Sequence, residues 1–254
     1  MKKLLAILAL SASLAFYGCE ESSTNSDGSD FSLGITGDTR WNYGAYNVDA
    51  SGEQTGDELY EETISFGSEM EFEKKLSHKM TYNTLGEDGQ LFNHIATDED
   101  GIYLYMDEID VNQFEQVKPD TETKIPIIIP GWIKIYDFNQ DNWESFFVEL
   151  DQVIGQDTVK GKLIISGSKQ GTESVSFSEK DYSAMLSNLS IEVEATVASP
   201  SLNVNEEVKS NLKFSFIEGV GIYSIMQEEN VLLGLENDII QVLKSAVVLE
   251  DETK

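Results

Sequence analysis

Alternation of apolar and polar residues with a period of two constrains this chain more than any other feature. Residues 190–197, SIEVEATV, and residues 211–216, NLKFSF, place an apolar side chain at every second position. The segments GKLIISGS, ESVSF and GIYLYM follow a similar pattern. Successive side chains of a β-strand point to opposite faces, so the pattern predicts antiparallel strands with one packed face and one wet face.

Short turn sequences separate these segments. They are GEDG at 86–89, DEDG at 98–101, GS at 167–168 and EG at 218–219. Glycine and acidic residues of this kind favour tight turns between strands. The spacing predicts a mainly β fold with an antiparallel, strongly curved sheet, in the form of a barrel or half-barrel.

Two segments are predicted to be short helices. Residues 142–155, NWESFFVELDQVIG, carry aromatic and aliphatic residues at helical spacing, with Asn142 as a cap and Gly155 as a stop. Residues 179–189, EKDYSAMLSNL, have room for one or two turns. A strand is the alternative for both segments, and especially for the first, which is rich in aromatic residues.

Residues 118–131 are predicted to form a rigid crossover, because Pro126 and Pro130 bracket the three isoleucines near its end and proline is unsuited to a central strand. Similar short motifs occur on either side of it. TRWNYGAY and DEDGIYLYMDE precede it, and WIKIYDF and IEGVGIYSIMQEE follow it. We therefore expect one acidic β-rich domain over residues 31–254, with two similar halves that meet near 118–131; chance similarity of short β-motifs is the alternative.

The N-terminal residues predict export. Lys2 and Lys3 precede an apolar run that extends to Tyr17, and no acidic residue occurs before Glu20. This layout is typical of a secretory signal peptide over residues 1–18. The run is too short for a comfortable transmembrane helix, and a buried core helix, the alternative, would show a polar face.

Cys19 is the only cysteine in the chain. The preceding residues LAFYG make the segment resemble a bacterial lipobox, which Gly18 matches and from which Phe16 and Tyr17 depart. The resemblance implies that Cys19 becomes the first mature residue and carries a lipid that anchors the protein in a membrane. The alternative is cleavage elsewhere, around 11–15. With one cysteine, the domain can form no internal disulfide.

Residues 19–30 are predicted to tether the domain to its anchor. The segment EESSTNSDGSD, which follows Cys19, has no apolar residue and cannot offset its chain entropy by burial. Glu20 and Glu21 resemble the acidic stretch that directs some Bacteroidota lipoproteins to the cell surface. We expect a membrane-anchored lipoprotein of the bacterial cell envelope, at the outer membrane or cell surface.

The chain is strongly acidic, with 46 Asp and Glu against 17 Lys and Arg and a formal charge of −29. A nucleic-acid partner needs a basic surface, so this class is excluded. Docking on anionic lipid by charge is disfavoured for the same reason. The acidic surface favours solubility by self-repulsion; divalent-cation binding or a saline habitat is the alternative.

No catalytic motif emerges. Residues 155–163 mimic a phosphate loop, but one residue too many separates the glycines and Leu163 replaces the Ser or Thr that would hold magnesium. His78 and His94 are the only imidazoles and lie outside any zinc motif, and His94 is predicted to be a hydrogen-bonded histidine in a strand. Carboxylate pairs for glycoside hydrolysis stay open, because their spacing cannot be seen in the sequence.

Calcium is the metal with the best sequence candidates. Two acidic turns could supply oxygen ligands, and they contain Asp98, Asp100 and Gly101, and Asn139, Asp141 and Asn142. Neither turn matches the twelve-residue calcium loop with its closing Glu. We predict no metal site, no cofactor and no catalytic residue.

One set of aromatic residues recurs at strand period. It comprises Trp41, Tyr43, Phe66, Phe72, Tyr103, Phe214, Phe216 and Tyr223. If the sheet curls, these side chains either fill the interior as an ordinary core or line a cavity for an apolar ligand.

The motifs RWNY, DGIYLY and FSFIEGVGIYSI resemble a broad set of secreted bacterial lipoproteins of uncharacterised function. A Trp-x-Tyr strand opens their domain, and an aromatic strand leads into a Gly-Val-Gly turn near its end. This chain lacks their Pro-Leu-x-x-Gly lead-in and has Leu33, Gly34 and Gly37 there instead. The resemblance implies a β-rich, lipocalin-like or half-barrel domain similar to lipoprotein carriers.

Three functions follow in order of preference. The first is a lipid-anchored, non-catalytic binding module, with an apolar or amphiphilic small molecule as ligand. The second is a structural or interaction protein of the outer envelope, with a filled core and an envelope protein as partner. The third is a carboxylate-based hydrolase. An open cavity favours the first, a filled interior the second, and two facing carboxylates in a cleft the third.

Overall fold

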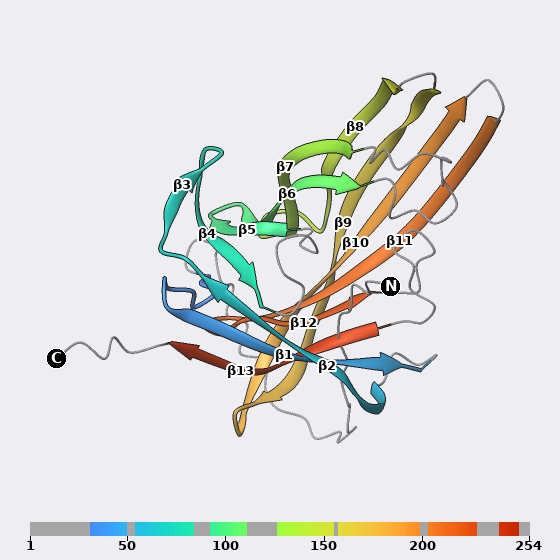
Figure 1. Cartoon of the computed structure of the whole chain (residues 1–254). Helices are drawn as coiled ribbons and strands as arrows, with labels where there is room; N and C mark the ends of the chain where they lie inside the picture. The colour runs from blue at the N-terminus through green and yellow to red at the C-terminus, as the bar shows by residue number, and fades with distance from the viewer. Residues whose placement is uncertain are drawn as a thin grey trace.

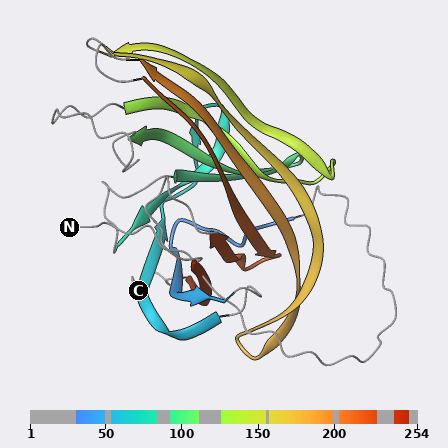
Figure 2. The same ribbon diagram turned by 90° about the vertical axis from the view of Figure 1, so that its right-hand side faces the viewer.

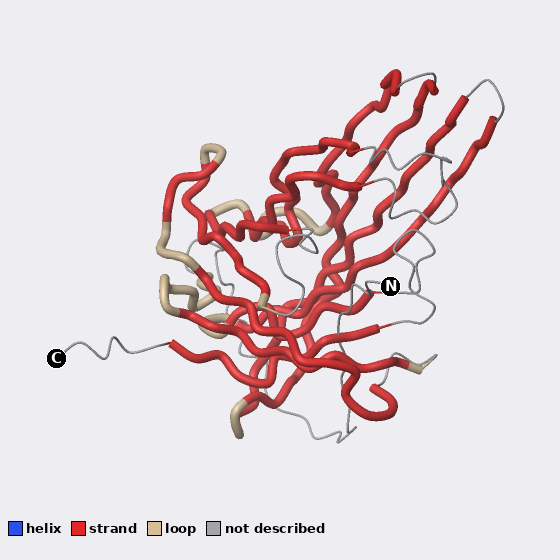
Figure 3. The backbone as a smooth tube through the Cα atoms, in the orientation of Figure 1, coloured by secondary structure: helices blue, strands red, loops and turns tan. Residues whose placement is uncertain are grey.

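The computed structural model describes residues 31–49, 54–83, 92–110, 126–154, 157–198, 203–227 and 239–248, and these residues form thirteen strands and no helix (Figures 1 and 3). The strands are β1 (Thr39–Val48), β2 (Gln54–Phe66), β3 (Met70–Phe72), β4 (Lys75–Tyr82), β5 (Phe92–Asp98), β6 (Gly101–Asp110), β7 (Pro126–Asp137), β8 (Asn142–Ile154), β9 (Asp157–Phe177), β10 (Lys180–Ala198), β11 (Asn203–Ile217), β12 (Gly221–Gln227) and β13 (Ile239–Val248). The described residues contain no helix able to cross a membrane.

All the strands belong to one antiparallel sheet, in the order β7-β6-β5-β4-β2-β1-β13-β12-β11-β10-β9-β8, with the short β3 paired to β4. The first and last strands of the chain, β1 and β13, pair in the middle of this order. The sheet curves strongly, so that its two ends approach each other (Figure 2). The predicted mainly β, antiparallel and strongly curved fold is confirmed.

The two terminal strands of the sheet, β7 and β8, are held together by side chains. The Trp143 indole Nε1–H and the Ser145 hydroxyl of β8 both donate to the Lys134 carbonyl of β7, at 2.8 and 3.0 Å. The Ser187 hydroxyl of β10 adds a bond to the Ile135 carbonyl of β7 at 2.7 Å. Backbone pairing between β7 and β8 is absent among the described residues. The sheet is therefore nearly closed into a barrel, with side-chain hydrogen bonds in place of the last ladder.

Both predicted helices are wrong. Residues 142–154 form β8, and the segment predicted as a helix over 179–189 falls mainly in β10. A β-bulge between Glu144 and Phe146 moves the alternation by one residue, so Trp143 and Phe146, three apart, both pack toward the core and imitate helical spacing. A second register shift, opposite Leu186 and Ser187 of β10, leaves Gln170 of β9 without a partner in the ladder.

The predicted crossover is wrong where the structure describes it, because Pro126 to Gly131 belong to β7. β7 is a terminal strand with a ladder on one side only, and proline is tolerated there because the missing N–H can face away from the ladder. Residues 118–125, the signal peptide over 1–18 and the tether over 19–30 lie outside the described residues. The duplication of two halves stays a prediction.

The inner face of the curved sheet forms one continuous hydrophobic core. Its largest fully buried side chains are Trp41, Tyr43, Ile95, Ile102, Ile133, Ile135, Leu163, Leu189, Phe216, Ile217 and Ile222. Two tryptophans lie directly against glycines: Trp41 packs on Gly221, whose φ is +133°, and Trp143 packs on Gly167. At both contacts the ring occupies the space that a Cβ would need.

The Trp143–Gly167 contact gives a stability prediction. A Cβ on Gly167 would lie 2.0 Å from Trp143 Cε2, so Gly167→Ala forces the indole away from its hydrogen bond to Lys134. We expect a loss of about 1–3 kcal/mol in the free energy of unfolding, measured by urea denaturation. Gly67→Ala is the control, because its Cβ would have no neighbour closer than 3.7 Å. Equal stability of the two variants would contradict the packing described.

Candidate functional site

Six of the eight aromatic residues predicted to share a face lie in the core, namely Trp41, Tyr43, Phe66, Phe214, Phe216 and Tyr223. Their rings touch each other or other core rings: Trp41 and Phe66 are 4.4 Å apart between centroids, and Phe214 and Phe216 are 5.9 Å apart. The Tyr43 hydroxyl is buried and donates to the Ile222 carbonyl at 2.8 Å. These six side chains fill the interior between the strands that carry them.

The other two predicted residues lie apart from this core cluster. Ile102, Leu104 and Met106 are the core-facing residues of β6, so Tyr103 points to the opposite, outer face. The Phe72 ring stacks on His94 at 3.8 Å and meets Tyr105 edge-on at 4.8 Å. The structure therefore divides the predicted aromatic face between two surfaces of the sheet.

Tyr103 is covered by two lysine side chains. Lys75 Nζ lies 3.6 Å and Lys134 Nζ 5.5 Å from the centre of its ring. Lys75 pairs with Asp98, and Lys134 pairs with Asp137 at 2.6 Å. Lysine stems cover the aromatic ring while their ammonium groups reach the carboxylates, which explains why an outer-face tyrosine is only 7% exposed.

The two turns considered for calcium lie side by side. Asn139 Nδ2 donates to Asp100 Oδ1 at 3.1 Å, and the Phe138 amide donates to the Asp100 carbonyl at 3.0 Å. Asp98 and Asp137 direct their carboxylates to lysines and to backbone amides of their own turns. Across the described ranges, no group of three or more His, Cys, Asp and Glu residues is arranged to hold a metal ion.

Both histidines have local partners. His94 lies in β5, and its Nδ1 is 2.9 Å from Asn93 Oδ1, so the prediction of a hydrogen-bonded strand histidine is confirmed. His78 lies in β4, with Nδ1 2.8 Å from the Gly67 carbonyl. A hydrogen bond between a ring nitrogen and an oxygen of this kind fixes the orientation of the imidazole ring.

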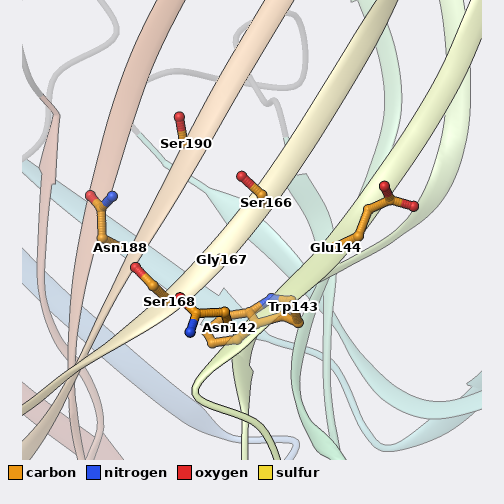
Figure 4. Close-up of a pocket in the computed structure, with 8 residues that line it drawn as sticks. All are labelled: Asn142, Trp143, Glu144, Ser166, Gly167, Ser168, Asn188 and Ser190. Atoms are coloured by element: carbon orange, nitrogen blue, oxygen red, sulfur yellow. The ribbon is translucent and has the colours of Figure 1, made fainter.

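A shallow depression of about 500 Å³ crosses the outer face of β8, β9 and β10 (Figure 4). Its polar lining forms two rows across the strands, with Asn142, Ser168 and Asn188 in one and Glu144, Ser166 and Ser190 in the other. Figure 4 shows Glu144, Ser166 and Ser190 projecting from the same side of the sheet. The surface is depressed here because the serine side chains of the middle strand are short, whereas the next row contains the longer side chains of Phe147 and Ile164.

The serines and asparagines of the depression can donate and accept hydrogen bonds, and two acceptors there lack a partner among the described residues. Asn188 donates to Asn211 Oδ1 at 3.4 Å, but its own Oδ1 is buried and has no hydrogen-bond partner. Glu144 is exposed and has no ion-pair partner among the described residues. Uncommitted acceptors of this kind suit a ligand or partner rich in N–H or O–H donors.

An unpartnered amide also lies inside the sheet. Gln227 is 0% exposed, and neither its Oε1 nor its Nε2 has a hydrogen-bond partner. It pairs across the ladder with the core residue Leu212, two residues from Ser210, whose buried hydroxyl is also unpartnered. Gln227 was not among the residues predicted from the sequence, although it occupies an inward position of the alternating series that contains Tyr223 and Ile225.

Comparison of the sequence with models of protein families finds no match, and neither does comparison with curated proteins. Two solved structures are distantly similar. One, described as a "putative lipoprotein" of Parabacteroides distasonis, is 14% identical, with a TM-score of 0.42 over 86% of this chain and 100% of that chain. The other, described as a "putative exported protein" with a YmcC-like fold from Bacteroides fragilis, is 11% identical, with a TM-score of 0.35 over 85% of this chain and 98% of that chain.

The Lys134–Asp137 pair gives a pH prediction. Burial raises the pKa of the Asp137 carboxyl, but hydrogen bonds from Lys134 and from the amides of Asn139 and Gln140 outweigh this effect and hold the pKa below its usual value. Asp137 therefore stabilises the fold above pH of about 4, and this stabilisation is lost as the pH falls through the lowered pKa.

We expect Asp137→Asn to cost about 1–3 kcal/mol of unfolding free energy at pH 7 and progressively less below pH of about 4. Urea denaturation from pH 7 to pH 2.5 measures this difference. Glu144→Gln, which removes an exposed and unpaired carboxylate, serves as the control and should change stability little at any pH. A constant deficit of Asp137→Asn across the whole pH range would show that charge is not the cause.

Proposed function

We propose that this protein is a lipid-anchored, non-catalytic interaction module of the bacterial cell envelope. The observation that carries the proposal is the packing of the six core aromatic residues against one another, which leaves the interior they line filled. A filled interior favours the interaction protein over the carrier of an apolar ligand. The outer face of β8 to β10, with its open depression and uncommitted acceptors, is then the surface available to a partner.

The anchoring part of the proposal rests on the sequence. A basic start, an apolar run and a lipobox-like segment precede Cys19, and an acidic and polar stretch follows it. A lipid on Cys19 would hold the domain at the outer membrane or the cell surface, with residues 20–30 between the membrane and the sheet. The negative charge of the chain would keep the domain from lying on anionic lipid.

A second candidate function is the carriage of a small polar ligand inside the sheet. The unpartnered amide of Gln227 and the unpartnered hydroxyl of Ser210 support it, because buried polar groups without partners are uncommon and costly. A ligand with both donors and acceptors would satisfy the amide at its two ends. This candidate differs from the apolar carrier by the chemistry of the group that is recognised.

The anchor is tested by lipid labelling in a bacterial host. Cells expressing the full chain are grown with radiolabelled palmitate, and the protein is isolated and exposed to film. We expect label in the wild-type protein and none in Cys19→Ala, because Cys19 supplies the only thiol. Cys19→Ala should also leave the membrane fraction. Label that persists in this variant would overturn the lipidation of Cys19.

The filled interior is tested with the apolar fluorescent probe N-phenyl-1-naphthylamine. We expect no saturable fluorescence increase with the wild-type protein, whereas Phe216→Ala should bind the probe in the cavity left by a ring that is 0% exposed. The same variant should lose about 3–5 kcal/mol of stability, so circular dichroism must first show that it is folded. Saturable binding by the wild-type protein would favour the apolar carrier instead.

A further inference from the structure

β8 ends the sheet, and no strand in the described part of the chain pairs with its second edge beyond Phe146. All its backbone pairs are with β9, and its side-chain contacts with β7 involve Trp143, Ser145 and Phe146 near its start. β8 to β11 project as a ribbon beyond the other strands, so the free edge lies at the side of this ribbon (Figure 1). A strand edge of this kind offers backbone donors and acceptors to an incoming strand.

Two of the other free edges, those of β7 and β2, are blunted in ways that β8 is not. β7 carries Pro126 and Pro130, which lack the N–H that pairing requires. β2 has a free stretch next to Gly56, whose φ of +73° and nearby register shift interrupt a regular ladder. β8 has neither proline nor glycine, and its only irregularity lies between Glu144 and Phe146, before the free part begins.

The free part of β8 has a defined outer face. Phe147, Glu149, Asp151 and Val153 alternate along it, and Phe147 and Val153 are 48% and 74% exposed. On the neighbouring β9, Lys160 lies 3.4 Å from Asp151, while Lys162 pairs with Glu194 of β10 at 2.7 Å. Glu149 has no ion-pair partner among the described residues. A strand added at this edge would therefore meet the series apolar, acidic, acidic, apolar.

We propose that the free edge of β8 from Phe147 to Val153 binds an extended segment of a partner protein by β-strand addition, and that this segment carries basic residues at alternate positions flanked by apolar ones. This inference rests on the proposed interaction role and names the chemistry of the partner. Main-chain hydrogen bonds provide the affinity in this mode of binding, and the alternating side chains provide the specificity.

A second copy of the chain is a poor occupant of the edge. Antiparallel pairing of two β8 strands about residue 150 would place Glu149 opposite Asp151 across the symmetry axis. Like charges directly opposite each other destabilise a strand pair, whereas Lys or Arg in the same positions stabilises it. The two carboxylates thus disfavour self-association and favour a basic strand.

The test uses a fluorescein-labelled peptide, TVTKTKTVT, whose lysines can face Glu149 and Asp151. Fluorescence anisotropy with the purified full chain should show saturable binding. Two further peptides carry N-methyl groups on alternate amides, one for each edge of the peptide. We expect at least one of them to bind at least tenfold more weakly, because its pairing edge has lost its donors. Equal binding of all three peptides would mean charge attraction alone and would overturn strand addition.

Two double variants separate the edge from the overall charge. Glu149→Lys with Asp151→Lys should weaken binding at least tenfold and allow binding of TVTETETVT. Glu179→Lys with Glu218→Lys reverses the same number of charges at two hairpin turns and should leave binding within about twofold. The proposal would be overturned if both double variants lost binding equally or if the wild-type protein did not bind the peptide. It would also be overturned if the free protein formed a dimer in sedimentation and the β8 variant abolished that dimer. None of these results bears on lipidation of Cys19 or on probe binding to Phe216→Ala. Failure of strand addition can therefore be distinguished from failure of the proposed function.

Discussion

The contact between β7 and β8 determines much of this structure. Twelve strands follow one another in a continuous antiparallel order, and a sheet of that length must either stay open or return to its beginning. Here it returns, and donors from Trp143 and Ser145 of β8 and from Ser187 of β10 meet two carbonyls of β7 in place of a backbone ladder. The curvature encloses the aromatic core, and the limited length of the contact leaves the rest of β8 without a second neighbour.

The alternation of apolar residues was sufficient to predict the fold class, because a period of two is incompatible with any other regular structure. It failed where the alternation is broken. In β8 a bulge adds one residue, and the inward side chains of Trp143 and Phe146 then stand three apart, as they would in a helix. Bulges depend on pairing with a neighbouring strand, so a single segment read by itself does not reveal them.

The candidate site was harder to predict, for a related reason. An aromatic residue in a strand was assigned to the core face, yet Tyr103 lies on the outer face beneath Lys75 and Lys134, which come from two other strands. The depression on β8 to β10 is made of serines and asparagines that are unremarkable one by one and become a surface only through register. The buried Gln227 differs, since a polar residue in an inward position was visible in the sequence.

These features favour a function in which the outer surface of the sheet binds a partner over one in which the interior encloses a ligand. The core aromatic side chains occupy the interior, while the open depression and the free edge of β8 lie close together at the outside of the same strands. Native mass spectrometry of the protein isolated from bacterial membranes, followed by solvent extraction, tests this account most directly. The account predicts the mass of the folded chain with its anchor and nothing else. A reproducible additional mass that disappears on extraction would contradict it, and loss of that mass in Gln227→Leu would identify the interior amide as the ligand site.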